Sequence, residues 1–370
     1  MKKITTTIAA LIIAAHSFAQ TTIIDSIVSN GIYRNYRLYV PAAYSSTSAR
    51  PLVINMHGYT SNAQQQQLYS NFMPIADTAN FLMVLPNGTF SGGSQYWNAG
   101  ISPFGANDIL FIDDLITHLK QSYNINLNRV YATGMSNGGF MSYTLACALS
   151  NKIAAIASVT GSIFTAQKNT CAPNRPVPVM QIHGTADATV PYGGSSGIEP
   201  IDSTVMYWVR NNQCATTPVF TAVPNTNTTD GCTAERYVYN NGNNGSTVEL
   251  FKIIGGAHTW PGAPVTVGVT NQDISASKEI WRFFNKYTLS QLTAIATTQP
   301  NELLNVYPNP ANSTIYITGV ANNATVKIID ILGKTILTAT DKTIDITSLQ
   351  AGMYIINVEN TTQHLKLIKE

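Results

Sequence analysis

The chain has 370 residues and a formal net charge of +2, with 44% hydrophobic and 11% charged residues, whereas roughly 25% of an average soluble domain is charged. An ordinary apolar content with a net charge near zero argues against disorder as the main state, and the length allows one large domain plus a small one or two medium domains. The 21 basic and 19 acidic residues nearly cancel and form no dense basic cluster, so a nucleic-acid partner is not expected.

The N-terminus has the layout of a secretory signal peptide. A positive start at Lys2 and Lys3 is followed by the apolar stretch Ile8 to Ala15 and by Ser17-Phe18-Ala19 before Gln20. This apolar stretch is well short of the roughly 20 residues that cross a bilayer, and no later segment approaches that length. We therefore predict a signal peptide over residues 1–19 and an exported protein without a membrane span.

Between Tyr36 and Tyr287 the chain alternates short β-rich runs with helical patterns. Six brief apolar runs, mostly bounded by Gly or Pro, are typical of buried parallel strands: residues 52–56, 81–85, 129–133, 153–159, 177–182 and 248–254. Apolar residues recur at helical spacing over residues 109–119 and 280–284. This order of strands and helices predicts an α/β domain with a mostly parallel sheet over residues 20–289.

The composition and pattern of the sequence change after Leu289. Residues 290–302 form a polar stretch that contains Pro300, which we interpret as a linker. Residues 303–370 carry short alternating runs at 314–317, 325–329, 335–339 and 353–358. This pattern predicts a small all-β, sandwich-like domain.

A candidate nucleophile, Ser136, follows the run 129–133. It lies in Gly134-Met135-Ser136-Asn137-Gly138-Gly139, and a helical pattern continues from Phe140. This is a G-x-S-x-G motif in its required context of strand, sharp turn and helix, typical of the α/β-hydrolase fold. The turn lifts the serine hydroxyl above the sheet edge, and the helix N-terminus behind it favours developing negative charge.

The order of residues along the chain selects the base and the acid. In this fold the serine is followed by the acid and then by the histidine, which leaves His183 and His258 as bases. His183 ends a predicted strand, so we expect it to pack under the sheet edge, and we predict His258 as the general base. Asp187 is the one intervening carboxylate directly after a predicted core strand, where catalytic groups gather, and we predict it as the acid that orients the base.

Acyl transfer also needs donors for an oxyanion. The backbone N–H of Asn137 follows the nucleophile and is one donor. The second should come from the loop after the run 52–56, where we predict the N–H of Tyr59, with Thr60 as the alternative. Gly58 beside it lets the backbone approach a substrate closely.

Four cysteines in an exported chain favour two disulfides. Pairing Cys147 with Cys171 and Cys214 with Cys232 closes the two shortest loops, and we predict this pairing. The alternative is that Cys147, on an apolar helical stretch, is a buried free thiol. No C-x-x-C spacing or other ligand cluster predicts a metal or an organic cofactor.

Four motifs in this order resemble secreted esterases of carbohydrate esterase family one, which includes feruloyl esterases, acetylxylan esterases and the related polyhydroxybutyrate depolymerases. They are Met56-His57-Gly58-Tyr59, Gly134-Met135-Ser136-Asn137-Gly138-Gly139, His183-Gly184-Thr185-Ala186-Asp187 with Val190-Pro191-Tyr192, and Gly256-Ala257-His258-Thr259-Trp260-Pro261-Gly262. The resemblance implies a triad of Ser136, Asp187 and His258. The family's frequent Cys after His-Gly is Tyr59 here, so one disulfide of those relatives is absent.

The tail resembles the C-terminal sorting domain of the type IX secretion system of Bacteroidota. The motifs are Tyr307-Pro308-Asn309-Pro310, Ile331-Leu332-Gly333-Lys334, Leu349-Gln350-Ala351-Gly352-Met353-Tyr354 and Lys366-Leu367-Ile368-Lys369. This resemblance implies the type IX machinery as a partner and an extracellular or surface location. A carbohydrate-binding module is the alternative, but the stretch holds no Trp or Phe to stack on sugars.

The resemblance implies a serine esterase that releases hydroxycinnamates from feruloylated plant arabinoxylan. Trp260 and Trp97, with Tyr96 and Tyr192, are candidates for an aromatic wall around the acyl ring. Acetylated xylan and the polyester polyhydroxybutyrate are the alternative substrates. A surface adhesin with an esterase fold is the non-enzymatic alternative, which the complete Ser, Asp and His set disfavours.

Overall fold

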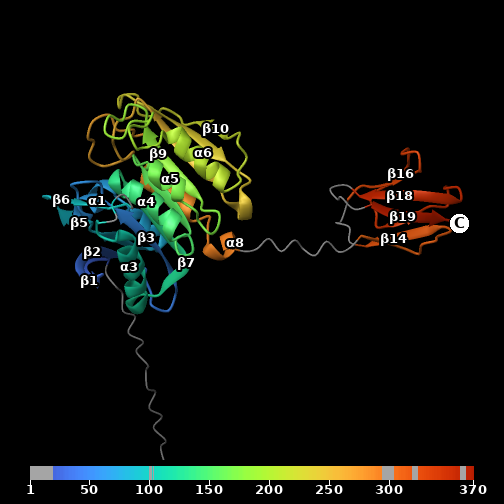
Figure 1. Ribbon diagram of the computed structural model, residues 1–370, viewed down its shortest axis with the longest axis horizontal. Helices are drawn as coiled ribbons and strands as arrows, with labels where there is room; N and C mark the ends of the chain where they lie inside the picture. The colour runs from blue at the N-terminus through green and yellow to red at the C-terminus, as the bar shows by residue number, and fades with distance from the viewer. Residues whose placement is uncertain (1–19, 100–101, 103, 294–303, 319–323, 359–363) are drawn as a thin grey trace, which may run out of the picture. The chain divides into compact units, whose positions relative to one another are not determined.

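The structure is a computed structural model that describes residues 20–99, 102, 104–293, 304–318, 324–358 and 364–370 (Figure 1). The chain divides into two compact units, Met1–Ala294 and Ile295–Glu370. The predicted signal peptide, residues 1–19, lies outside the described residues. None of the described helices is both long and apolar enough to cross a membrane.

A ten-stranded sheet forms the centre of the first unit, in the order β1-β2-β4-β3-β7-β8-β9-β12-β11-β10. Its strands are β1 (Thr21–Ser29), β2 (Ile32–Val40), β3 (Arg50–Met56), β4 (Leu82–Pro86), β7 (Ile125–Met135), β8 (Ala155–Val159), β9 (Val179–Gly184), β10 (Val219–Ala222), β11 (Thr233–Tyr239) and β12 (Val248–Ile254). The six strands from β4 to β12 in this order pair in parallel, whereas β1, β2, β10 and β11 pair antiparallel. A separate hairpin is made by β5 (Thr89–Ser91) and β6 (Ser94–Tyr96).

Helices cover both faces of this sheet. One apolar cluster joins one face to α3 (Asp108–Ser122), α4 (Asn137–Ala148) and α6 (Ile201–Asn211). Figure 1 shows these helices on one side of the sheet together with α5 (Thr165–Thr170). A second cluster joins the other face to α1 (Ala63–Ser70), α2 (Met73–Ala79), α7 (Ala276–Phe284) and α8 (Leu289–Thr293). Because both faces are covered, β4 and β8 are buried along their whole length.

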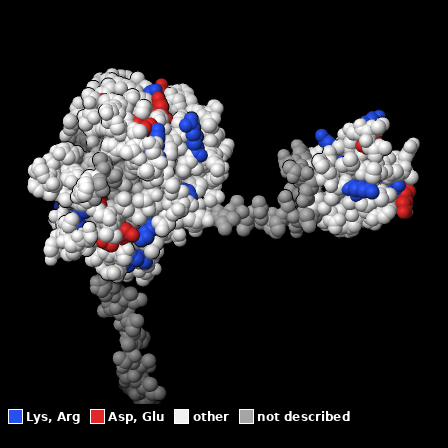
Figure 2. All heavy atoms as spheres, in the orientation of Figure 1, with Lys and Arg blue, Asp and Glu red and all other residues white. Residues whose placement is uncertain are grey.

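These elements confirm the predicted α/β class with a mostly parallel sheet. The first unit continues past the predicted end at residue 289, because α8 buries Leu289 and Leu292 against the second cluster. Figure 2 shows that the visible face of this unit is largely uncharged, with its Lys, Arg, Asp and Glu side chains in small separate groups.

The second unit is a small β-sandwich. One sheet has the order β13-β14-β17 and the other the order β16-β15-β18-β19. Their bounds are β13 (Asn305–Tyr307), β14 (Thr314–Thr318), β15 (Val326–Ile329), β16 (Thr335–Ala339), β17 (Thr343–Asp345), β18 (Gly352–Val358) and β19 (His364–Lys369). Inward residues of both sheets, such as Ile317 and Ile356, share one apolar core, as the alternating sequence pattern predicts.

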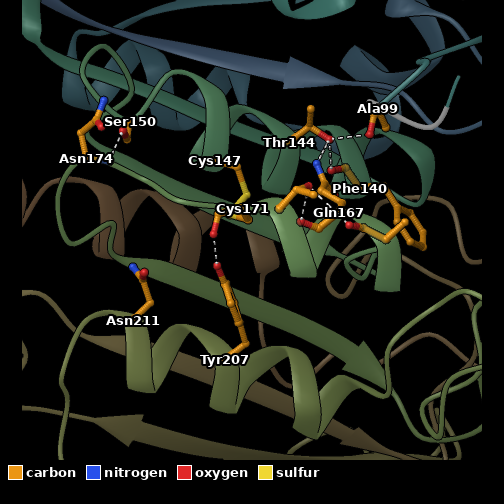
Figure 3. Close-up of a disulfide and its surroundings, with 12 residues drawn as sticks. Ala99, Phe140, Thr144, Cys147, Ser150, Gln167, Cys171, Asn174, Tyr207 and Asn211 are labelled. Carbon is orange, nitrogen blue, oxygen red and sulfur yellow. Dashed lines mark hydrogen bonds between the residues drawn. A yellow bond between two sulfur atoms is a disulfide. The ribbon is translucent and has the colours of Figure 1, made fainter. Parts of the chain in front are cut away.

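One of the two predicted disulfides is present. Cys147 of α4 is bonded to Cys171 beyond the end of α5, with their Cα atoms 5.1 Å apart (Figure 3). The predicted bond between Cys214 and Cys232 is wrong, since both are buried free thiols. Cys214 packs in the cluster on one face of the sheet and Cys232 in the cluster on the other, so the sheet separates them.

Candidate active site

Ser136 occupies a sharp turn between β7 and α4. Its backbone has φ 52° and ψ −118°, a strained conformation for a residue with a side chain. The glycines of the motif make the turn possible: a Cβ on Gly134 would lie 2.6 Å from the carbonyl oxygen of Met56, and one on Gly138 would collide with the same oxygen. The G-x-S-x-G spacing therefore reflects close packing of this turn against the end of β3.

Asp187 and His258 form a buried hydrogen-bonded pair. The Asp187 side chain is 0% exposed, and its Oδ2 lies 2.7 Å from His258 Nδ1. Its Oδ1 accepts the backbone N–H groups of Thr189 and Val190, each at 2.8 Å. Burial by itself would raise the pKa of Asp187, but the hydrogen bonds from His183 and His258, the charge of His258 and the Val190 N–H lower it well below its ordinary value. Asp187 is therefore a stable carboxylate facing the His258 ring.

Ser136 and His258 line the same cavity, which has a volume of about 520 Å³. Within the described residues no hydrogen bond joins the Ser136 hydroxyl to His258; such contacts often close only when a substrate is bound. Tyr59 and Tyr69 lie on its wall with Val265 and Val267, and no Lys, Arg, Asp or Glu among the described residues lines it. The cavity thus suits an uncharged, largely apolar group next to Ser136.

The backbone N–H groups of the two predicted oxyanion donors, Tyr59 and Asn137, have no hydrogen-bond acceptor among the described residues. The alternative donor, Thr60, is engaged because its N–H donates to the carbonyl oxygen of Gln95 at 2.9 Å. Gly58 packs beside the nucleophile, since a Cβ there would lie 3.4 Å from Ser136 Cβ.

Trp97 lies in the core, not on the cavity where we expected it, and it joins the two segments that carry the predicted oxyanion donors. Its side chain is 0% exposed, and its Nε1–H donates to the carbonyl oxygen of His57 at 3.0 Å. Its backbone N–H donates to Asn137 Oδ1 at 2.6 Å, and its carbonyl accepts from Asn137 Nδ2 at 3.0 Å. Trp97 therefore connects the loop of Tyr59 to the turn of Asn137.

His57 is also structural. Its Nε2 accepts the N–H of Gly88 at 2.9 Å, so its Nδ1 carries the proton and donates to the carbonyl oxygen of Gly58 at 2.7 Å. Burial lowers the pKa of His57 to about 4. A neutral ring therefore holds the backbone just before Tyr59.

The other predicted aromatic residues also differ from the expected wall. Trp260 is buried and packs edge-on against Phe72, so it does not line the cavity. Tyr96 is not among the residues that line the cavity, and its ring lies 6.4 Å from that of Tyr59. Tyr192 lies away from the cavity wall and donates its hydroxyl to Asp202 at 2.6 Å. Tyr69, on the Gln-rich helix α1, carries no recognisable signal in the sequence.

Two family profiles match separate parts of the chain. Residues 106–214 match the phospholipase/carboxylesterase family. Residues 305–370 match the secretion system C-terminal sorting domain. The second match covers the β-sandwich unit and confirms the predicted sorting domain and export by the type IX system.

Curated relatives include acetylxylan and feruloyl esterases. A bifunctional acetylxylan esterase/xylanase of Neocallimastix patriciarum is 33% identical over 46% of this chain and 24% of its own length. Feruloyl esterase B of Piromyces equi is 31% identical over 59% of this chain and 41% of its own length. Feruloyl esterase D of Neurospora crassa is 27% identical over 70% of this chain and 83% of its own length. The chain thus spans less than half the length of the first two relatives.

Among solved structures, the acetyl xylan esterase from Aspergillus awamori has a TM-score of 0.52 and 17% identity, covering 72% of this chain and 99% of that one. This likeness confirms the α/β-hydrolase fold of the first unit.

Proposed function

We propose that this chain, an α/β-hydrolase unit joined to a type IX sorting domain, is a secreted serine carboxylic-ester hydrolase. The observation that carries the proposal is the 2.7 Å hydrogen bond between His258 Nδ1 and the buried Asp187, at a cavity that Ser136 also lines. The similarity to feruloyl and acetylxylan esterases adds support.

The proposed mechanism assigns one role to each group. Ser136 Oγ attacks the ester carbonyl while His258 Nε2 takes its proton, and Asp187 stabilises the imidazolium that forms. The N–H groups of Tyr59 and Asn137 stabilise the oxyanion. His258 then returns the proton to the departing alcohol, and a water molecule deprotonated by His258 releases the acid from Ser136.

The cavity favours a bulky, uncharged acyl group. It provides about 520 Å³ beside the nucleophile, more than an acetyl group fills, and its wall presents two tyrosine rings and two valines without a charged residue. A hydroxycinnamoyl group offers a flat ring to such a wall. We therefore infer that the enzyme is a feruloyl esterase, the activity that the names of several relatives carry, and we propose feruloylated arabinoxylan as its substrate.

The test compares esters of different acyl groups. The mature chain is incubated with methyl ferulate, feruloylated arabinoxylan, acetylated xylan and a polyhydroxybutyrate film, and released acid is measured beside a Ser136→Ala control. The proposal predicts that kcat/KM for the feruloyl ester exceeds that for the acetyl ester, with no turnover by the control. Acetate release or film clearing without ferulate release would keep the esterase and refute the feruloyl assignment.

A further inference from the structure

We propose that His183, held by Gln181 and Tyr143, fixes the orientation of the Asp187 carboxylate and is therefore a positioning residue for the hydrolysis. The inference rests on the proposed function, since it assigns His183 a role through Asp187. It adds three buried residues to the site that lie outside the cavity and touch no substrate.

His183 lies near the end of β9, directly beneath the acid. Its side chain is 0% exposed, and its Nε2 is 2.8 Å from the carbonyl oxygen of Val190 and 3.3 Å from Asp187 Oδ2. His258 Nδ1 contacts the same Oδ2 at 2.7 Å. Two imidazole rings thus share one carboxylate oxygen, His258 at the cavity and His183 on the buried side.

Neighbouring side chains determine which nitrogen of His183 carries the proton. The carbonyl oxygen of Gly161 can only accept, so the group 2.9 Å from it must be the Gln181 amide nitrogen. The same nitrogen donates its second hydrogen to His183 Nδ1 at 2.9 Å. Nδ1 is therefore an acceptor, and the proton is on Nε2, where it points at Val190 and Asp187.

The network begins on the helix that follows the nucleophile. Tyr143 of α4 is 0% exposed, and its hydroxyl donates to Gln181 Oε1 at 2.6 Å. Gln181 is also 0% exposed. A continuous series of hydrogen bonds therefore runs from α4, through Gln181 and His183 of β9, to Val190, whose N–H donates to Asp187, and His183 Nε2 itself lies 3.3 Å from Asp187 Oδ2. It connects the helix behind Ser136 to the loop that carries the acid.

Asp187 depends on these donors because water does not reach it. Its oxygens accept two backbone N–H groups and the His258 Nδ1–H. The Nε2–H of His183, which donates to the Val190 carbonyl at 2.8 Å, lies 3.3 Å from Asp187 Oδ2 and faces it as well. A buried carboxylate that loses one donor is free to turn and holds its partner less well. His183 supplies such a donor and thereby limits rotation of Oδ2 away from His258.

The first test, made on the mature full chain, asks whether the Nε2–H donor of His183 is what matters or only the presence of its ring. His183→Leu removes the N–H, whereas His183→Gln can place an amide N–H near the position of Nε2. With methyl ferulate, His183→Leu should lower kcat by about 10- to 100-fold with KM nearly unchanged, the effect of losing one hydrogen bond to a charged group. His183→Gln should retain activity within about threefold. Thr204→Val, which removes a buried hydroxyl outside this network, should leave kcat unchanged.

A double-variant cycle then asks whether His183 acts through Asp187. In an Asp187→Asn background, His183→Leu should cause no further loss of kcat. The inference would be overturned if His183→Leu lowered kcat by the same factor in the wild-type and Asp187→Asn backgrounds. It would also be overturned if folded His183→Leu and His183→Gln lost the same fraction of kcat. A wild-type chain that hydrolyses no ester would instead refute the proposed function itself.

A spectroscopic measurement covers the case in which His183→Leu fails to fold. Two-bond ¹H–¹⁵N correlation spectra of the wild-type chain identify the protonated nitrogen of each histidine, with His183→Gln used for assignment. The inference predicts that His183 carries its proton on Nε2. A proton on Nδ1 alone would contradict it, whatever the activity.

Discussion

The buried carboxylate of Glu249 on β12 allows a quantitative test of how the site is supported. Its side chain is 0% exposed and contacts Arg282 at 2.6 Å, Arg236 at 2.9 Å and Lys286 at 2.9 Å. These contacts join α7 and β11 to the strand that leads to His258. Burial would raise the pKa of Glu249, but its hydrogen bonds and charge interactions with Arg282 and Lys286 lower it from 4.5 to about 2.

The lowered pKa of Glu249 determines how much its ionised carboxylate contributes to the free energy of unfolding, and how that contribution depends on pH. Each pKa unit corresponds to about 1.4 kcal/mol, so ionised Glu249 contributes about 3 kcal/mol to the free energy of unfolding. Because the folded pKa lies below the unfolded one, this contribution is fully present above pH 4.5 and is lost as the pH falls toward 2. About 2 kcal/mol of it should be gone by pH 3.

Urea denaturation of the wild type and Glu249→Gln at pH 7 and pH 3 tests this reasoning. We expect the variant to be less stable by about 3 kcal/mol at pH 7 and by only about 1 kcal/mol at pH 3. Glu279→Gln is the control, since Glu279 contacts the same Arg282 at 2.6 Å but is partly exposed; it should change stability by less than about 1 kcal/mol. A stability difference between wild type and Glu249→Gln that is the same at both pH values would refute the assignment to charge.

Three further predictions concern the oxyanion loop, the cavity and the disulfide. Trp97→Phe removes the Nε1–H that holds the His57 carbonyl, so kcat for methyl ferulate should fall about tenfold with KM unchanged; an unaltered kcat would show that Trp97 does not brace the loop. Val267→Asp places a charge on the cavity wall and should raise KM for methyl ferulate about tenfold. A KM equal to that of the wild type would show that the acyl group does not bind in this cavity. Replacing Cys147 and Cys171 by Ser should lower the free energy of unfolding by about 3 kcal/mol without changing kcat, and urea denaturation of the double variant showing wild-type stability would contradict this.

The sequence predicts those features that local pattern determines. The runs that became β3, β4, β7, β8, β9 and β12 are short and mostly apolar because both faces of the sheet are covered. The glycines around Ser136 are required by contacts with Met56, so the turn is recognisable without the fold. The order of serine, acid and histidine then selects Asp187 and His258, which the fold brings within 2.7 Å.

Other features depend on packing between distant segments. Trp97 and Trp260 are as suited to a core as to a cavity, and only tertiary contacts decide between the two. Loop length favours a bond between Cys214 and Cys232, but it carries no information on which face of the sheet each lies. The edge strands β1 and β10 keep many exposed residues, so their patterns are weak. The part played by His183 follows from its hydrogen bonds, which sequence spacing does not specify.

The central claim is that Ser136 is the nucleophile of an ester hydrolase. The most direct measurement is labelling of the mature chain with a fluorophosphonate ester, followed by peptide mass spectrometry to locate the adduct. The account predicts one adduct, on Ser136, formed together with loss of methyl ferulate hydrolysis and absent from Ser136→Ala. An adduct on another residue, or full ester hydrolysis by Ser136→Ala, would contradict it.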